Sequence, residues 1–549
     1  MLNRRAAISA LTGANFLLGQ GPRPRRPNIL VVMTDDQGYG DLSLHGNANL
    51  QTPNLDALAK QGAQCTRFHV SPVCSPTRSS LLTGRYNYRT GVVDTFLGRS
   101  MMRPTETTIA EMLRPAGYRT GIFGKWHLGD NYPLRPVDQG FDESLVLNGG
   151  GIRQPGDPPE ALTGKKPSYF DPVLSRNGKW EQTKGYCTDV YFREAMRFMV
   201  RRAGRPFFCY LATNAPHTPL EVDEEKVKPF LARGLDETTA RVYAMVENID
   251  ENMGRMLAFL REQNLEQNTL LVFLSDNGPQ QQRFNAGMRG RKGSVYEGGT
   301  RVPCFVRWPG VIAPEQSMDR LAAHIDVVPT LLEAAQVKTN VKLDGKSLLP
   351  LFREPSKASE WADRKIFLQW HRGDQPEAFR ASAVVTQKYK LVDGKELFDL
   401  EADPAESRDV AAAHPEVVKD LRQAYELWFT DVGQQGYAPP RIVISKLAPT
   451  LLTRQDWRGT QASWDTKGIG HWEVQTAFAG PYTVTLLFSP SEAKRTLEGT
   501  WIGKHEIAPG QTKLELKQVK LPILREAKFE ASLREGDAAR GIDYAYFVP

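Results

Sequence analysis

A cysteine and an arginine lie four residues apart in the stretch SPVCSPTRSSLLTGR, as Cys74 and Arg78. Ser75 is a favourable helix N-cap, Pro76 suits the first helical position, and Gly84 suits the C-terminal stop. The pattern predicts a short helix with Cys74 at its positive end, where backbone N–H groups and the helix dipole favour an anion. Arg78, one turn later, can direct its guanidinium toward the same anion.

Two apolar runs end in pairs of polar residues. Residues 29–33 and 270–274 are apolar without alternation, which is typical of central parallel strands covered on both faces. One such pair is usually a solvated turn, but two pairs at the ends of two buried strands favour a metal site. Oxygen ligands suit a hard divalent cation such as Ca²⁺ or Mg²⁺. The candidate ligands are Asp35, Asp36, Asp276 and Asn277.

Two further apolar runs lead to basic residues and histidines. YRTGIFGKWHLG leads to Lys125 and His127, and RPFFCYLATNAPHTP leads to His217. Ligands bind outside the carboxyl ends of parallel strands, so these side chains are expected to meet in one crevice. Histidine titrates nearest neutral pH and is the natural acid or base, although a lone histidine is more often structural. Lys292, in the glycine-rich MRGRKGSVYEGG, is another candidate cation.

Six motifs together carry a resemblance to a known family. Residues 74–78 match the C-x-P-x-R motif of the type I sulfatases, and TDDQG, GKWHLG, APHTP, SDNG and GRKGSVYEGGTRVP match that family in order over most of residues 28–310. The chain therefore resembles the formylglycine-dependent, arylsulfatase-like enzymes of the alkaline-phosphatase-like superfamily. The resemblance implies that a formylglycine-generating enzyme oxidises Cys74 while the chain is unfolded. The hydrated aldehyde, a geminal diol, would then be the nucleophile.

The resemblance also assigns roles to the other candidates. It implies that a Ca²⁺ ion, rather than Mg²⁺, is held by the four candidate ligands and by the modified Cys74. Arg78, Lys125, His217 and Lys292 would bind the substrate sulfate. His217, with Lys292, would protonate the leaving alcohol. His127 would remove a proton from the second diol hydroxyl, so that the sulfated intermediate collapses to aldehyde and sulfate. His45, His69 and His324 are further substrate-contact candidates.

The substrate is expected to be a sulfated carbohydrate, and aryl sulfates are expected to react because their leaving group is good. A glycine- and proline-rich segment, residues 148–172, is the expected specificity loop. Two other functions remain open. One is a phosphate or phosphonate monoester hydrolase of the same superfamily, and the other is a catalytically silent glycan-binding protein.

The fold class is α/β, a doubly wound, mostly parallel sheet with helices on both faces. Helical patterns such as NLDALAKQGA and TIAEMLRPAG alternate with the strands. We expect a catalytic domain over 28–345, a small antiparallel sheet with a helix over 346–435, and a β-sandwich-like module over 436–549. Three tryptophans of this module fit either a sugar-stacking platform or, as we favour, its core: Trp464, Trp472 and Trp501.

Charge and composition limit the partners. Residues 1–27 carry five arginines and no acid, so they account for five of the seven formal positive charges and leave +2 for the rest. This small excess disfavours a nucleic-acid partner. The leader MLNRRAAISALTGANFLLGQG is typical of an export signal, with Arg4-Arg5 indicating the twin-arginine type and a periplasmic or extracellular location. Its apolar run is too short for a membrane span. Five irregularly spaced cysteines indicate neither a zinc site nor a disulfide framework.

Overall fold

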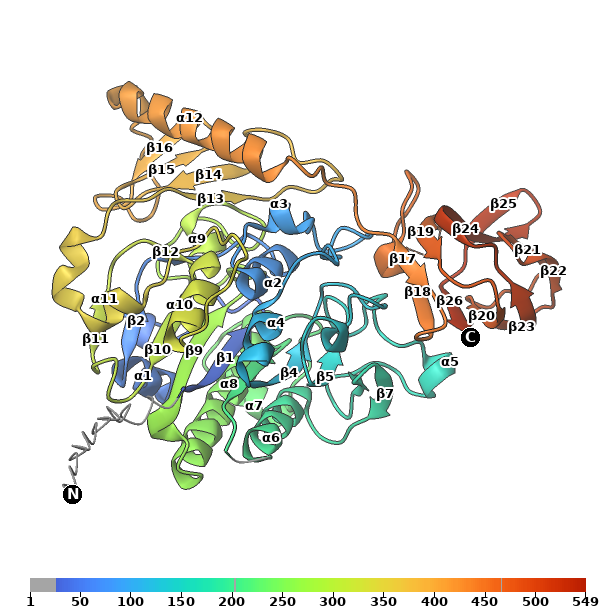
Figure 1. Ribbon diagram of the computed structural model, residues 1–549, viewed down its shortest axis with the longest axis horizontal. Helices are drawn as coiled ribbons and strands as arrows, with labels where there is room; N and C mark the ends of the chain where they lie inside the picture. Colours follow the sequence, from blue (N-terminus) through green and yellow to red (C-terminus); the bar gives the residue numbers. More distant parts are fainter. Residues whose placement is uncertain (1–25, 202–203, 466) are drawn as a thin grey trace, which may run out of the picture.

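The computed structural model describes residues 26–201, 204–465 and 467–549, so nearly all of the predicted leader lies outside the described residues. A ten-stranded sheet forms the centre, in the order β11-β2-β10-β9-β1-β8-β4-β5-β6-β7 (Figure 1). Strands β9, β1, β8, β4 and β5 are parallel to one another. The strands are β1 (Asn28–Thr34), β2 (Ala63–Cys65), β4 (Arg119–Lys125), β5 (Glu143–Leu147), β6 (Val173–Arg176), β7 (Lys179–Gln182), β8 (Phe207–Ala212), β9 (Thr269–Ser275), β10 (Cys304–Arg307) and β11 (Gln316–Met318).

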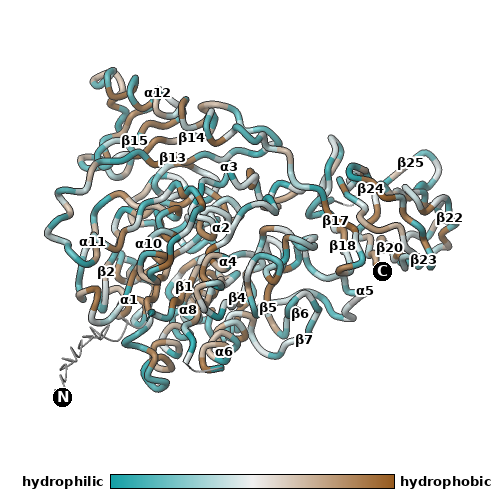
Figure 2. The backbone as a smooth tube through the Cα atoms, in the orientation of Figure 1, coloured by the Kyte–Doolittle hydropathy of each residue, from teal (hydrophilic) through white to brown (hydrophobic). Residues whose placement is uncertain are grey.

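Helices cover both faces of this sheet, as the unbroken apolar runs predict. Along β1, Ile29, Val31 and Met33 pack into one core while Leu30 and Val32 pack into the other. Because neighbouring strand residues point to opposite faces, a strand buried on both sides must be apolar throughout. Apolar residues accordingly concentrate on the central strands in Figure 2. The first core includes residues of α2 (Cys74–Thr83), α4 (Ile109–Leu113) and α10 (Val327–Ala334), and the second includes residues of α1 (Pro53–Lys60), α6 (Cys187–Val200) and α8 (Glu237–Glu262).

Shorter elements connect these layers. Strands β3 and β12 form a separate parallel pair. Among the described residues, no helix combines the length and the hydropathy that a membrane span requires. The remaining short elements are β3 (Phe68–His69), β12 (Ala322–Ala323), α3 (Asn87–Thr90), α5 (Glu160–Thr163), α7 (Glu224–Ala232), α9 (Glu297–Thr300) and α11 (Leu349–Arg353).

Antiparallel sheets follow the α/β region. One four-stranded sheet shares a core with the long helix α12 (Pro415–Val432). After residue 441, two further sheets enclose a single core, so this part of the chain is a β-sandwich. The first sheet contains β13 (Ile366–Gln369), β14 (Ser382–Val385), β15 (Tyr389–Val392) and β16 (Glu396–Asp399). The sandwich contains β17 (Ile442–Ile444), β18 (Thr450–Thr453), β19 (His471–Thr476), β20 (Pro481–Leu487), β21 (Arg495–Gly499), β22 (Gly503–Ile507), β23 (Lys513–Lys520), β24 (Leu524–Glu535), β25 (Ala538–Gly541) and β26 (Tyr544–Val548).

The C-terminal sandwich is docked onto the α/β region by directional contacts. The Asn131 side chain donates to the Leu451 carbonyl (3.0 Å) and accepts from the Leu451 N–H (2.9 Å), as a neighbouring strand would. The N–H of Gly98 donates to the Gln455 carbonyl (3.0 Å). Apolar residues of the α/β region, Leu97 among them, join the sandwich core. These contacts fix the segment around residues 94–100 against the sandwich.

Candidate active site

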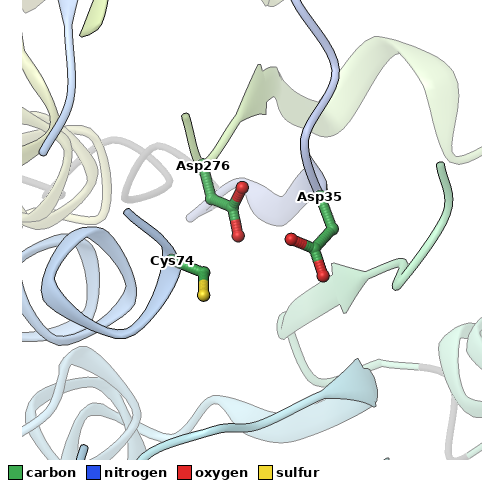
Figure 3. Close-up of side chains that lie close together, drawn as sticks. All are labelled: Asp35, Cys74 and Asp276. Atoms are coloured by element: carbon green, nitrogen blue, oxygen red, sulfur yellow. The ribbon is translucent and has the colours of Figure 1, made fainter. Parts of the chain in front are cut away.

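Most of the candidate site residues lie at or just beyond the carboxyl ends of four neighbouring strands, at one edge of the sheet. Strands β9, β1, β8 and β4 are adjacent, and Thr34 pairs with Ser275, so the next residues of β1 and β9 emerge side by side. The residues that follow β1 and β9 are Asp35 and Asp276. Figure 3 shows their carboxylates and the Cys74 thiol pointing into a shared space. The convergence expected from the sequence is therefore present in the structure.

A glycine allows β4 to reach this edge. Gly124 has a φ of 123°, and a Cβ built there would lie 1.8 Å from the Ala212 carbonyl oxygen of the neighbouring strand. A side chain at this position is therefore excluded. The close approach of β4 and β8 sets the position of Lys125, the last residue of β4.

Helix α2 begins at the cysteine itself. The N-cap is Val73, in extended conformation and without a side-chain cap bond, so the prediction of Ser75 as N-cap was wrong. The helix begins two residues earlier than predicted, because the extended Val73 backbone already leads into it. Gly84 ends the helix with a φ of 69°, as predicted. Burial raises the pKa of the Cys74 thiol, even though Lys125 and Lys292 act to lower it. The unmodified thiol is therefore a weak nucleophile.

Each carboxylate of the site faces a cation. All six side chains are buried or largely buried, and each carboxylate uses one oxygen for its partner. Arg78 also donates to the Lys125 carbonyl (3.1 Å), so it bridges two of the pairs. The pairs are Lys125 Nζ with Asp35 Oδ2 (2.6 Å), Arg78 Nη2 with Asp276 Oδ2 (2.7 Å) and Lys292 Nζ with Asp36 Oδ1 (2.7 Å).

Three other oxygens of the predicted ligands are buried without a hydrogen-bond partner among the described residues: Asp35 Oδ1, Asp36 Oδ2 and Asn277 Oδ1. Unpartnered buried acceptors are costly, so each such group calls for an explanation. Ligand atoms of Asp35, Cys74 and Asp276 also lie within 4.8 Å of one another. Burial and the nearby Asp35 raise the pKa of Asp276 to about 6. This donor set fits a hard divalent cation.

His127 is oriented with one nitrogen toward Cys74. Its Nδ1 lies 3.5 Å from Cys74 Sγ, and its Nε2 lies 2.7 Å from the Thr95 carbonyl oxygen. Because a carbonyl only accepts, Nε2 carries the proton and Nδ1 presents a lone pair to Cys74. Burial, with help from Lys125, lowers the pKa of His127 well below its ordinary value. The imidazole is therefore neutral and suited to act as a base toward an oxygen at residue 74.

His217 faces the site from the other side. Its Nδ1 donates to the Thr218 carbonyl (2.7 Å), so Nε2 is the free nitrogen and lies 3.8 Å from Asp36 Oδ2. Burial, and then Lys292, lowers the pKa of His217 to about 3. Burial acts to lower the pKa of Lys292 as well, but Asp36 outweighs it and keeps that pKa above its ordinary value. In the free protein, Lys292 rather than His217 holds the proton.

The other three candidate histidines contact other protein groups and do not face the pocket. His69 is fully buried and bonds to Glu297 (2.9 Å), and His324 is buried beside Ser71 (3.1 Å). The His45 ring stacks on a tyrosine, Tyr39, with centroids 3.8 Å apart. None of the three lines the pocket over Cys74.

That pocket has a volume of about 600 Å³ and is lined by residues of all three parts of the fold. The deep residues Cys74, His127 and His217 were predicted. Gln154 belongs to the predicted specificity loop over 148–172, whereas the pattern of the sequence gives no signal for the rim residues Phe96, Trp370 and Arg372. Trp464, which we expected in the sandwich core, also lines the pocket.

A second contact from the sandwich reaches the surroundings of His127. The side-chain amide of Gln455 donates to the Thr95 carbonyl (2.9 Å), the same oxygen that holds His127 Nε2. The Gln455 nitrogen lies 3.4 Å from that imidazole nitrogen. Sequence reasoning missed Gln455 because 328 residues separate it from His127.

A buried cysteine at a helix N-terminus, surrounded by carboxylate–cation pairs near the ends of parallel strands, suits the hydrolysis of anionic esters. The family model described as Sulfatase matches residues 27–337, and the one described as N-sulphoglucosamine sulphohydrolase, C-terminal, matches residues 291–428. The chain belongs to the sulfatase family and is a sulfuric ester hydrolase.

Named relatives agree with this assignment. N-acetylgalactosamine-6-sulfatase of Canis lupus familiaris is 32% identical over 67% of this chain and 74% of its own length. Arylsulfatase A of Homo sapiens is 32% identical over 78% of this chain and 88% of its own length. The crystal structure of Ps i-CgsB in complex with k-i-k-neocarrahexaose superposes with a TM-score of 0.68, at 30% identity, covering 76% of this chain and 95% of that one.

Proposed function

We propose that the chain is a carbohydrate sulfatase that uses formylglycine, formed from Cys74, and a bound Ca²⁺ ion. The observation that carries this proposal is the group of three unpartnered buried oxygens on Asp35, Asp36 and Asn277. These residues, with Asp276 and the oxygen that would replace Cys74 Sγ, would hold the ion. When bound, the ion would stabilise charge on a sulfate oxygen and lower the pKa of the attacking hydroxyl.

The charges of the site support the binding of a divalent cation together with a sulfate ester. Arg78, Lys125 and Lys292 balance three carboxylates, so the ionised site is neutral when both histidines are neutral. A divalent cation adds two positive charges. A sulfate monoester carries one negative charge and a deprotonated hydroxyl carries another. The complete reacting assembly is therefore neutral again, which favours it in a buried site.

The geometry supports an assignment of the groups that carry protons. His127 Nδ1 would accept a proton from an oxygen on residue 74, while the Thr95 carbonyl holds the Nε2 proton in place. Lys292 would supply the proton for the departing alcohol, alongside His217. A bound sulfate anion would raise the pKa of His217 from its low value in the free protein, because opposite charges favour the charged form. Arg78 and Lys125 would neutralise the sulfate oxygens.

The names of the relatives support a carbohydrate substrate. One relative is named for an N-acetylgalactosamine 6-sulfate ester, and the structure with the TM-score of 0.68 holds an oligosaccharide. We further propose export, based on the basic leader, and a division into domains at 28–345, 346–435 and 436–549.

Two measurements test the proposal. The protein is co-expressed with a formylglycine-generating enzyme and digested, and the mass of the peptide spanning Cys74 is measured by mass spectrometry. A mass change corresponding to CH₂SH becoming CHO is expected. Released sulfate is then measured by ion chromatography for an aryl sulfate, N-acetylgalactosamine 6-sulfate and neocarrageenan oligosaccharides, with and without Ca²⁺. Modified protein that releases sulfate from none of the sugars would contradict the carbohydrate assignment, and an unmodified thiol would contradict the formylglycine mechanism.

A further inference from the structure

Two aromatic side chains are in contact at the rim of the pocket. Phe96 belongs to the α/β region and Trp464 to the C-terminal sandwich. The rings of Phe96 and Trp464 lie 5.2 Å apart at an interplanar angle of 81°. The guanidinium of Arg372 lies over Phe96, 4.4 Å from the ring centroid, and pairs with the buried Asp94 (2.9 Å). Phe96 is therefore fixed by its neighbours, and its contact positions Trp464 at the rim.

Trp464 differs from the tryptophan that forms the core of the sandwich. Trp472 is fully buried, and its indole N–H donates to the Thr453 carbonyl (2.7 Å). Trp464 is only half-buried and lines the pocket over Cys74. Trp464 packs against the edge of the sandwich core, but the accessible part of its ring faces the pocket and can contact a ligand there.

Trp464 also lines a second cavity. This cavity, of about 680 Å³, shares Trp464 and Gln154 with the catalytic pocket. Its lining contains both cations and carboxylates, among them Lys166, Asp157 and Glu160. Each cavity is within the range of about 300–1,000 Å³ that is typical of small-molecule sites. Together they offer room for a ligand that extends past the sulfated sugar.

We propose that Trp464 and Gln154 form a subsite for the sugar ring linked to the one whose sulfate is removed, so that the natural substrate is an oligosaccharide or polysaccharide. This inference rests on the proposed function. The indole face would stack on the apolar face of the second ring, and the Gln154 amide would bond to its hydroxyl groups.

Binding is measured by calorimetry in a Cys74→Ala background, so that the readout does not depend on turnover. One pair of probes is N-acetylgalactosamine 6-sulfate and a chondroitin 6-sulfate tetrasaccharide. The other pair is galactose 4-sulfate and k-i-k-neocarrahexaose. In at least one pair, the longer probe is expected to bind about tenfold tighter, equivalent to roughly 1.4 kcal/mol. Trp464→Ala should remove most of this advantage, and Trp464→Phe should retain part of it.

The matched control is Trp501→Ala, in the same sandwich, where the ring packs on Phe529. This variant should keep the preference for the longer probe. Gln154→Ala is a second test, outside the sandwich, that does not depend on how Trp464→Ala folds. A preference that survives both Trp464→Ala and Gln154→Ala would overturn the inference, and so would the absence of any preference for length in either pair. Sulfate release from the unaltered enzyme tests the proposed function separately.

Discussion

Gln455 and His127 share one acceptor: both donate to the carbonyl oxygen of Thr95, at 2.9 Å and 2.7 Å. Gln455 belongs to the C-terminal sandwich, whereas His127 follows strand β4. The carbonyl that fixes the imidazole tautomer is therefore itself held by a residue beyond the region that the family models match. The sandwich thereby contacts the carbonyl that orients the His127 imidazole.

Replacing Gln455 by Ala should lower kcat for an aryl sulfate about tenfold while leaving KM nearly unchanged. The Thr95 carbonyl would lose a donor, and a small displacement of a catalytic base is costly. Steady-state kinetics measure the effect, and Gln455→Asn should restore part of the rate. Gln461→Ala, at an exposed position of the same sandwich, is the control. A change confined to KM would show that Gln455 does not position His127.

Replacing Arg78 by Lys should lower both stability and activity. Arg78 makes two bonds to Asp276 (3.0 and 2.7 Å) and one to the Lys125 carbonyl, and lysine cannot reproduce this planar fork. Breaking a buried pair costs about 3–5 kcal/mol when one partner is lost, so a sizeable part of that loss is expected. Thermal unfolding measures it, with the half-exposed Arg114→Lys as control. A melting temperature equal to that of the unaltered protein would contradict the buried network.

Ca²⁺ added to chelated protein should raise its melting temperature. A ligand at 100 times its dissociation constant stabilises the folded state by about 2.7 kcal/mol. Asp35→Asn should reduce this gain because it removes one charged ligand from the buried site, whereas the exposed Asp319→Asn should keep it. A Ca²⁺ response that is identical in Asp35→Asn and in the unaltered protein would place the ion elsewhere. Mg²⁺ in place of Ca²⁺ tests the identity of the cation.

The raised pKa of the buried Asp456 carboxyl should make the stability of the protein depend on pH. Burial raises its pKa from 3.8 to about 7, and its neighbour Asp130 has a pKa well above the ordinary range because of burial and of Asp456 itself. Between pH 3.8 and about 7, Asp456 is protonated in the folded state but ionised in the unfolded chain. The folded state therefore binds more protons, and the free energy of unfolding falls as pH rises from about 4 to 7. At about 1.4 kcal/mol per pKa unit, the effect reaches a few kcal/mol.

Asp456→Asn should therefore raise the free energy of unfolding at pH 8 and flatten its pH profile between pH 5 and 8. Denaturant titrations at several pH values measure this. Asp465→Asn, an exposed residue of the same sandwich, is the control. An unchanged profile in Asp456→Asn would show that the carboxylate is ionised at little cost in the folded protein.

The sequence predicts the centre of the site well because its chemistry lies at the ends of long apolar runs. Asp35, Asp276 and Lys125 each end or follow a strand whose burial is visible in the residue types alone, and parallel strands share one carboxyl edge. The helix start was displaced by two residues, since a favourable cap residue, Ser75, does not outweigh the extended backbone of Val73.

The rim of the pocket could not be predicted in the same way. Trp464 and Gln455 lie more than 300 residues from Cys74 and His127, and local periodicity contains no information on which loop a distant module contacts. Residue type was also an uncertain guide for His69 and His324. Their partners, Glu297 and Ser71, come from remote segments and make both histidines part of the framework.

The burial of Cys74 and the neutrality of the ion-free site suggest an order for modification, folding and ion binding. Cys74 is only 3% exposed in the folded chain, so an enzyme that modifies it must act before the α/β region closes. The three carboxylates carry their own counterions, so the chain does not need the metal to avoid repulsion as it folds. The proposed ion could therefore be acquired last, after folding, and its supply would then set the fraction of enzyme that is active.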